Sequence, residues 1–117
     1  MVLKADKREF AKWDGVEGGC GELILEMVTD KRVNPSNVSL CAHAKLDPGS
    51  GIGYHEHYGE SEIYYILSGK GLYDDNGTKR EVTVGDVTYT PHGQGHSLEN
   101  IGDCVLEFMA IINTDER

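Results

Sequence analysis

The chain has 117 residues, which is room for a single domain over residues 1–117, and its 20 acidic and 11 basic side chains give a formal net charge of −9. This charge, without any basic block, argues against partners that present phosphates, so we expect no nucleic-acid and no membrane partner. No apolar run approaches the ~20 residues that span a bilayer and no apolar signal core opens the chain, so we expect a cytoplasmic protein.

In chain order, a brief helix is expected only near residues 6–13, and the rest of the sequence predicts short strands separated by Gly, Pro or Asn. The clearest is 38–47, where even positions are apolar and odd positions are polar or thiol, the pattern of a strand with two different faces. A glycine-rich loop is expected at 48–53, and Asn76-Gly77 favours a hairpin turn. The expected strands are 22–29, 38–47, 62–67, 72–74, 79–82, 87–90, 96–99 and 105–112.

So many short strands with regular turn signals indicate an all-β sandwich, jelly roll or barrel. The three cysteines, Cys20, Cys41 and Cys104, form neither a disulfide framework nor a thiolate zinc site, because their number is odd and no pair is closely spaced. Any metal ion in this protein would therefore be bound by histidine and carboxylate.

Such residues occur in two stretches. His55 and His57 are two positions apart and so share one face of a strand, and a tight turn at 58–60 would return Glu62 beside them. His96 lies near the centre of the second stretch, 85–100. Three imidazoles and one carboxylate suit one divalent transition metal ion, namely manganese, iron, nickel or zinc. Alone, the His-x-His pair is more simply explained as two surface histidines.

The full spacing is far more specific. The first stretch has Gly49, five residues, His55-Glu56-His57, four residues, Glu62, six residues and Gly69. The second has Gly85, five residues, Pro91-His92-Gly93, two residues, His96, three residues and Asn100. These stretches resemble the two signature motifs of the cupin superfamily, with every fixed position filled, and the 15-residue spacer 70–84 is similar to that of small microbial cupins.

The resemblance implies a single-domain jelly-roll β-barrel of two antiparallel sheets, with one metal ion bound inside by His55, His57, Glu62 and His96. It also implies a homodimer, for which the residues before Val38 would supply an edge strand. Known cupins include dioxygenases, isomerases, decarboxylases and lyases, as well as proteins that bind sugars or other metabolites without turnover, and the motifs do not select among these.

Strand alternation extends the expected site. If Glu62 points inward, so does Tyr64, which would then act as a catalytic proton donor near the metal or simply pack in the core. Glu107 interrupts an apolar segment and is either an inward general base or an edge residue. His43 shares a face with Cys41 and Lys45, for which a solvent-facing surface is favoured.

We therefore expect a metal-dependent enzyme that acts on a small oxygenated metabolite chelated at the metal. A non-catalytic binding or sensor protein for a sugar or metabolite is the alternative, and a purely structural metal is a third interpretation. His92 is expected at the rim of the site, and Glu56 and Glu60 are expected in solvent.

Overall fold

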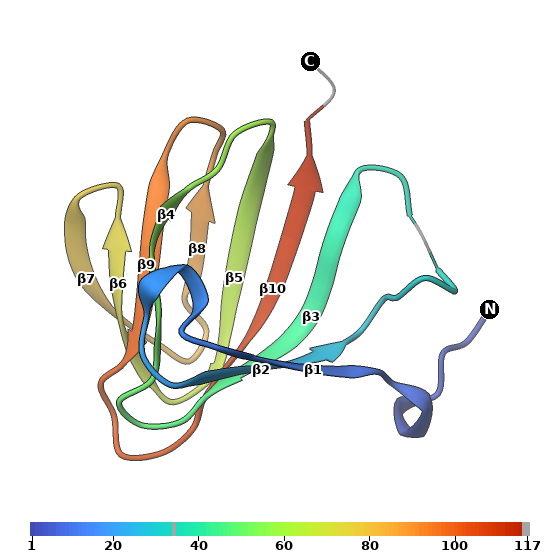
Figure 1. Ribbon diagram of the computed structural model, residues 1–117, viewed down its shortest axis with the longest axis horizontal. Helices are drawn as coiled ribbons and strands as arrows, with labels where there is room; N and C mark the ends of the chain where they lie inside the picture. The colour runs from blue at the N-terminus through green and yellow to red at the C-terminus, as the bar shows by residue number, and fades with distance from the viewer. Residues whose placement is uncertain (34, 116–117) are drawn as a thin grey trace.

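The structure of the protein is a computed structural model that describes residues 1–33 and 35–115. It is built from strands with two short 3-10 turns, η1 (Ala5–Lys7) and η2 (Val16–Gly18) (Figure 1). The strands are β1 (Phe10–Asp14), β2 (Glu22–Met27), β3 (Val38–Leu46), β4 (Gly51–Glu56), β5 (Glu60–Ser68), β6 (Lys70–Asp75), β7 (Thr78–Thr83), β8 (Val87–Thr90), β9 (Gly95–Asn100) and β10 (Leu106–Thr114).

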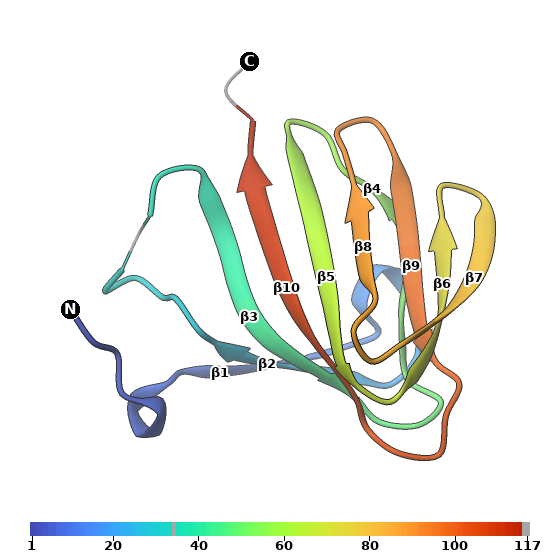
Figure 2. The ribbon, with the colours of Figure 1, turned by 180° about the vertical axis from the view of Figure 1, so that it is seen from behind.

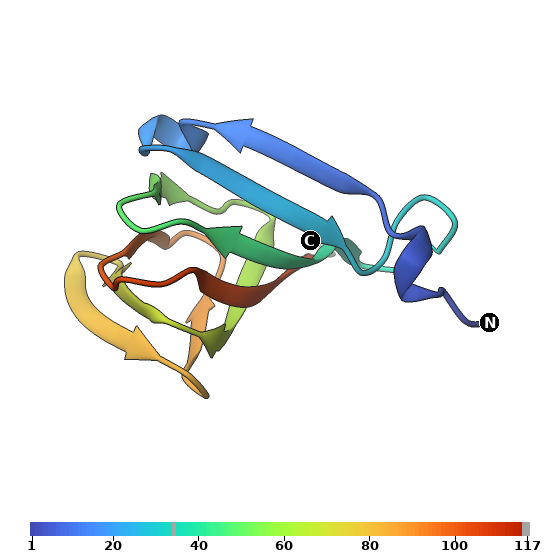
Figure 3. The ribbon, with the colours of Figure 1, turned by 90° about the horizontal axis from the view of Figure 1, so that it is seen from below.

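The strands form two antiparallel sheets that face each other. The larger sheet has the order β1-β2-β3-β10-β5-β8 and the smaller has the order β4-β9-β6-β7. Figure 2 shows β3, β10, β5 and β8 side by side in the larger sheet, and Figure 3 shows β1 and β2 on one side of the molecule with β7 on the other. The predicted all-β architecture with two antiparallel sheets is confirmed.

The core lies between the inner faces of the sheets. In β3, Ala42, Ala44 and Leu46 are buried, whereas Cys41, His43 and Lys45 between and before them are only half-buried and lie on the outer face. Phe108 in β10 and Ile66 in β5 complete the same layer and are also fully buried. Removing the large apolar side chains of this layer, Leu46, Ile66 and Phe108, from water stabilises the fold by about 1.5–3 kcal/mol each. The alternation read from the sequence of 38–47 is therefore the alternation of the folded strand.

The hairpin expected at Asn76-Gly77 is present between β6 and β7. Both residues have positive φ, 50° for Asn76 and 104° for Gly77, as the tight two-residue turn requires. The Asp74 carboxylate accepts the Gly77 N–H at 2.8 Å, and the Asn76 side chain accepts the Gly95 N–H at 3.1 Å. The turn is thus attached to the start of β9, the strand that carries His96.

The N-terminal segment differs from the expectation of a helix near residues 6–13. Only Ala5–Lys7 forms a 3-10 turn, and Phe10–Asp14 is strand β1, paired with β2 from Phe10 opposite Glu26 to Asp14 opposite Glu22. A strand can replace the expected helix here because β2 offers an open edge whose backbone groups satisfy those of β1.

The glycine-rich loop expected at 48–53 is also shorter than predicted, because residues 51–53 belong to β4. A Cβ atom on Gly53 would lie 2.0 Å from the carbonyl oxygen of Glu17, and one on Gly19 would lie 2.1 Å from that of Gly51. These glycines therefore allow η2 to pack its backbone directly against β4 (Figure 1). Within the described part of the chain, no helix has the length and apolar character needed to cross a membrane.

Candidate metal centre

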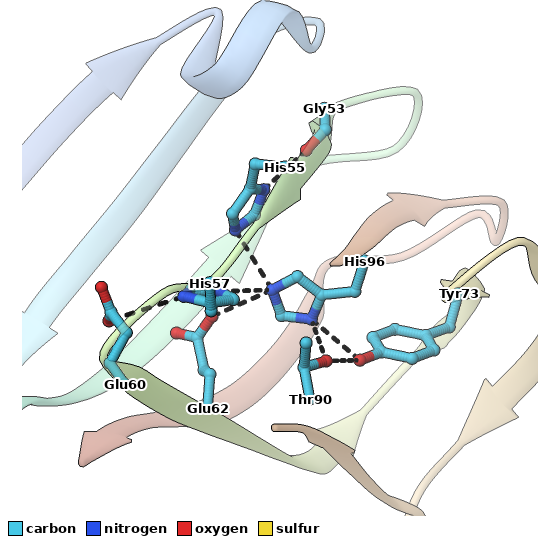
Figure 4. Close-up of polar contacts among 8 residues, drawn as sticks. All are labelled: Gly53, His55, His57, Glu60, Glu62, Tyr73, Thr90 and His96. Carbon is cyan, nitrogen blue, oxygen red and sulfur yellow. Dashed lines mark hydrogen bonds and ion pairs between the residues drawn. The ribbon is translucent and has the colours of Figure 1, made fainter. Parts of the chain in front are cut away.

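Four side chains selected from the sequence lie together inside the barrel (Figure 4). His55 lies in β4, His57 directly follows that strand, and Glu62 lies in β5 after the turn at Gly59, where φ is 71°. His96 lies in β9, directly opposite His55 in the β4–β9 pairing. The two-residue alternation around β4 and the short β4–β5 turn thus bring the residues of the first motif together, and the β4–β9 pairing adds His96 of the second motif.

The distances within this cluster are short. His96 Nε2 lies 3.0 Å from His57 Nε2, 3.1 Å from His55 Nε2 and 3.1 Å from Glu62 Oε1. His57 Nε2 lies 3.2 Å from the same carboxylate oxygen, and all four ligand atoms are within 4.8 Å of one another. Three imidazole nitrogens and one carboxylate oxygen therefore converge on a single small volume.

The other ring nitrogen of each histidine has its own partner. His55 Nδ1 lies 2.8 Å from the carbonyl oxygen of Gly53, and His57 Nδ1 lies 3.5 Å from a carboxylate oxygen of Glu60. Because these oxygens only accept, they place the proton on Nδ1 and leave the lone pair of Nε2 pointing into the cluster.

His96 is held by two hydroxyl groups. Its Nδ1 lies 2.8 Å from the Tyr73 hydroxyl and 2.9 Å from Thr90 Oγ1, and the two hydroxyls are 2.6 Å apart (Figure 4). Tyr73 comes from β6 and Thr90 from β8, so both sheets fix this ring. A hydroxyl that accepts a proton from Nδ1 leaves the lone pair of His96 Nε2 facing the cluster.

The charges in the cluster follow from burial and these contacts. Burial raises the pKa of Glu62, but hydrogen bonds with His57 and His96 outweigh it and hold the pKa below its ordinary value of 4.5. Burial lowers the pKa of His96 below 6.5, so this ring is neutral at pH 7. Glu62 raises the pKa of His57, mainly through their hydrogen bond and against the effect of burial.

A divalent transition metal fits this donor set. Neutral imidazoles and a carboxylate are the ligands that manganese, iron, nickel and zinc accept, and the partners at Nδ1 are those that orient metal-ligating histidines. Without a cation, three Nε2 atoms and a carboxylate oxygen lie 3.0–3.2 Å apart, and the only protons between them are those of the rings, as in the His57–Glu62 hydrogen bond. A bound cation would take the place of such a proton and attract all four atoms at once.

A cavity of about 240 Å³ opens beside the cluster. His55, His57 and Glu62 lie on its wall, and most of its remaining lining is apolar, contributed by β2, β3 and β10. Trp13, Glu17 and Glu60 also line the cavity, and both Trp13 and Glu17 are exposed to solvent. The N-terminal segment is therefore part of the site, although the sequence analysis assigned it no functional residue.

Tyr64 lies at the cavity, as strand alternation predicted. Its ring stacks on His96 with centroids 5.0 Å apart and an interplanar angle of 21°, and its other neighbours include Phe108 at 4.8 Å. Burial, followed by the charge of Glu62, raises its pKa well above 10, so the phenol stays protonated. It thus packs in the core and contributes to the cavity wall.

Glu107 is not brought to this cavity. It lies on the outer face of β10, between the buried Leu106 and Phe108, and its Oε1 is 2.9 Å from Nε2 of His43. The structure thereby places His43, Cys41 and Lys45 on the outer face as well, away from the candidate metal cluster. Val105 and Met109 do share the face of Glu107, but that face is the outer one.

Several contributors to the site had no usable signal in the sequence. Tyr73 and Thr90 reach His96 only because β6 and β8 come from different sheets, and no local pattern distinguishes them. Glu60 was expected in solvent, yet it contacts His57 and lines the cavity. His92 accepts the Gly59 N–H at 2.7 Å and so supports the β4–β5 turn.

The fold and the cluster together define an all-β barrel protein with an internal histidine and carboxylate site. The family model described as Cupin domain matches residues 42–112. A protein named oxalate-binding protein from Thermotoga maritima is 40% identical over 112 residues, covering 96% of this chain and 93% of that protein. The chain therefore belongs to the cupin family, as the two motifs predicted.

Two further relatives extend this comparison. The crystal structure of a protein described as a predicted oxalate decarboxylase from Thermotoga maritima matches with a TM-score of 0.90 and 39% identity, covering 97% of this chain and 99% of that one. Oxalate decarboxylase OxdC from Bacillus subtilis is 31% identical over 105 residues, which cover 86% of this chain but only 27% of OxdC. The first comparison covers the whole barrel, while the second concerns about a quarter of a much longer protein.

Proposed function

We propose that this protein binds one divalent transition metal ion through His55, His57, Glu62 and His96. We further propose that it uses the ion to bind a small acid through two adjacent oxygen atoms. The observation that carries the proposal is the convergence of three Nε2 atoms and one carboxylate oxygen beside an open cavity. Four protein ligands around an octahedral ion would leave two positions open, and a bidentate ligand would need these two to be neighbours.

When bound, the ion supplies Lewis acidity, which polarises an attached oxygen and stabilises negative charge on it. The residues around it perform distinct tasks. Gly53, Glu60, Tyr73 and Thr90 hold the imidazoles in the orientation in which Nε2 faces inward. Tyr64, stacked on His96 and kept protonated by burial, restricts the motion of that ring and closes the cavity behind it.

Oxalate is the first ligand to test. The Thermotoga maritima relative is named for binding it, and OxdC of Bacillus subtilis is named for decarboxylating it. Oxalate offers two oxygens on adjacent carbons, the arrangement that two neighbouring positions on a metal accept. These similarities support a chelating acid as the ligand class.

The test is calorimetric titration of oxalate into protein loaded with Mn²⁺ and into the same protein freed of metal. We expect saturable binding of one oxalate per metal ion in the loaded protein and none in the metal-free protein. Glu62→Ala should lose both metal and oxalate binding, whereas Glu107→Ala on the outer face should keep both. Equal oxalate binding with and without metal would contradict the proposal.

Catalysis is the second candidate, because Glu17 and Glu60 place carboxylates on the same cavity. A carboxylate beside a metal-bound acid can accept or donate a proton, as the decarboxylase, dioxygenase, isomerase and lyase reactions considered above require. Incubating the metal-loaded protein with oxalate, with and without oxygen, and following formate, carbon dioxide and oxygen would detect turnover. Stable binding without any product would favour the binding or sensor function.

We also propose a homodimer in which the open edge of β1 takes part. β1 ends the larger sheet, and Phe10 and Trp13 on it are 64% and 48% exposed. An edge strand with exposed aromatic side chains is a favourable surface for pairing with another chain. Sedimentation equilibrium should give the mass of two chains, and the mass of one chain at micromolar concentration would contradict this arrangement.

A further inference from the structure

We propose that, among the acids that chelate the metal, the site prefers a monocarboxylic acid with an adjacent oxygen and an apolar side chain, such as a branched 2-oxo acid, over a small dianion such as oxalate. The inference rests on the proposed function because the acid would chelate the bound ion. It specifies which acids the cavity selects, and it follows from two independent features, the charge of the lining and the row of side chains next to Glu62.

The first feature is the charge of the cavity. Its lining includes the carboxylates Glu17, Glu60 and Glu62, and no Lys or Arg among the described residues contributes to it. A divalent ion with the single charge of Glu62 leaves one net positive charge, which a monoanion neutralises. A dianion would leave a net negative charge and would also face Glu60 and Glu17. Such repulsion is only partly screened near a cavity wall.

The second feature is an apolar path that starts at the cluster. On the inner face of the larger sheet, Ile112 of β10 is directly opposite Glu62 of β5, and Leu40 of β3 is directly opposite Ile112. Neighbouring strands are about 4.8 Å apart, so these two side chains lie at ~5 and ~10 Å from the position of Glu62 along the sheet. On this sheet, a side chain extending from the metal in this direction would meet the apolar groups of Ile112 and Leu40.

Ile112 and Leu40 differ from the rest of the inner face. Both side chains line the cavity, as do Ala110 and Phe108 in β10 and Ala44 in β3. These last three are buried, whereas Ile112 and Leu40 are only half-buried. Their apolar surface is therefore available to a ligand. Oxalate has no atoms to cover this surface, whereas an isobutyl or similar group has.

Val16 and Trp13 complete this apolar wall from the N-terminal segment. The packing of Gly19 and Gly53 described above fixes η2 against β4 and so sets the position of Val16. The apolar side chain of the acid would lie between η2 and the Ile112–Leu40 pair. Glu17, with φ of 53°, is held at the same place and adds negative charge there.

The experiment compares three acids by calorimetry with the full chain loaded with Mn²⁺ under anaerobic conditions. The acids are pyruvate, the 2-oxo acid with an isobutyl side chain, and oxalate. Pyruvate and the isobutyl acid have the same chelating group and the same charge. The ratio of their affinities therefore measures only the contribution of the apolar path. We expect the isobutyl acid to bind at least about tenfold more tightly, since each buried methylene contributes ~4-fold.

Ile112→Ala and Ile111→Ala form a matched pair of variants. Both residues are half-buried in β10, but Ile111 lies on the outer face, opposite Cys41 and Ile63. Ile112→Ala should reduce the preference for the isobutyl acid over pyruvate by several-fold, and Ile111→Ala should leave it unchanged. Equal binding of the two acids by the unmodified protein would overturn the inference, as would an equal effect of the two variants.

Glu17→Gln tests the charge argument separately, with Glu81→Gln on β7 as a control for the same change in net charge. Glu17→Gln should increase the affinity for oxalate by a larger factor than the affinity for pyruvate, and Glu81→Gln should not. If the protein binds oxalate only with metal but does not bind the isobutyl acid more tightly than pyruvate, this inference is refuted and the proposed function remains in place. Absence of metal-dependent binding of all three acids would refute both.

Discussion

Two clusters of histidine and carboxylate lie on opposite faces of the larger sheet, and only one of them has the properties of a metal site. On the outer face, His43 lies between Glu107, at 2.9 Å from Nε2, and Glu26, at 3.7 Å from Nδ1, and Arg8 bonds to Glu26 at 2.7 Å. On the inner side, three histidines carried by β4, the residue after it and β9 of the smaller sheet direct Nε2 toward one another and toward Glu62 of the larger sheet.

The two clusters differ in how their hydrogen-bond donors and acceptors are arranged in space. In the outer cluster, cationic or donor groups alternate with carboxylates, so each acceptor has a donor within the protein. In the inner cluster, the donors at Nδ1 are directed outward and the acceptors are directed to one point. Residue type is therefore a weak indicator of a metal site, and the direction of the ring nitrogens is a strong one.

The largest expected effect is that of removing one inner carboxylate. Glu62→Ala should lower metal affinity by more than about 100-fold while the circular dichroism of the barrel is retained, because Glu62 contributes a converging ligand atom rather than apolar packing. Elemental analysis after dialysis measures the metal content. Glu107→Ala is the outer-face counterpart, and a similar loss of metal in both variants would remove the distinction between the clusters.

The second-largest effect on metal affinity is expected from removing the hydroxyl groups that orient His96. The double variant Tyr73→Phe with Thr90→Val removes both hydroxyl partners of Nδ1 and should lower metal affinity by about 10–100-fold. Competition with a chromophoric chelator measures this change. Full affinity in the double variant would show that the ring is held by packing against Tyr64 alone.

The response to pH should have opposite signs in the metal-free and metal-loaded protein. The folded-state pKa of His57 is raised above 6.5, so in the metal-free protein its contribution to stability is complete below pH 6.5 and is lost as pH rises through the raised value. Metal binding needs the neutral ring, so metal affinity should rise over the same window.

Urea unfolding of the metal-free protein and metal titration, both measured from pH 6 to 9, would test these signs. Metal-free His57→Ala should lack this part of the stability change. A metal affinity that falls as pH rises through this window would be inconsistent with neutral His57 as a ligand.

The smallest effect is expected at the outer cluster. Arg8→Ala breaks the pair with Glu26, whose pKa Arg8 lowers mainly by hydrogen bonding and against the effect of burial. Because the pair is partly exposed, we expect the free energy of unfolding to fall by less than about 1 kcal/mol, with no change in metal content. A loss above about 2 kcal/mol in urea unfolding would show that the outer cluster stabilises the sheet more than its exposure implies.

Predictions from the sequence succeeded where a local pattern determines the structure. The period of two placed Tyr64 and Ile66 on the inner face and Tyr65 on the outer face of β5, and Asn76-Gly77 formed its hairpin. The predictions failed where a segment distant in the chain determines the local structure. The region near residues 6–13 is mostly strand because β2 pairs with it, and the glycines of 51–53 belong to β4 because η2 packs on them.

The sequence alone therefore determined the cupin family and the residues whose side chains meet inside the barrel. For His55, His57 and Glu62 the spacing is sufficient, because strand alternation and tight turns depend on residues close together in the chain. For His96 the prediction came from the resemblance of the second motif to the cupin signature, since β9 pairs with β4 from about 40 residues away. Only the tertiary structure decided which side of the sheet Glu107 faces, which hydroxyls orient His96, and which apolar side chains line the cavity. These depend on pairing among β3, β10 and β5 and on packing between two sheets, whose partners lie tens of residues apart.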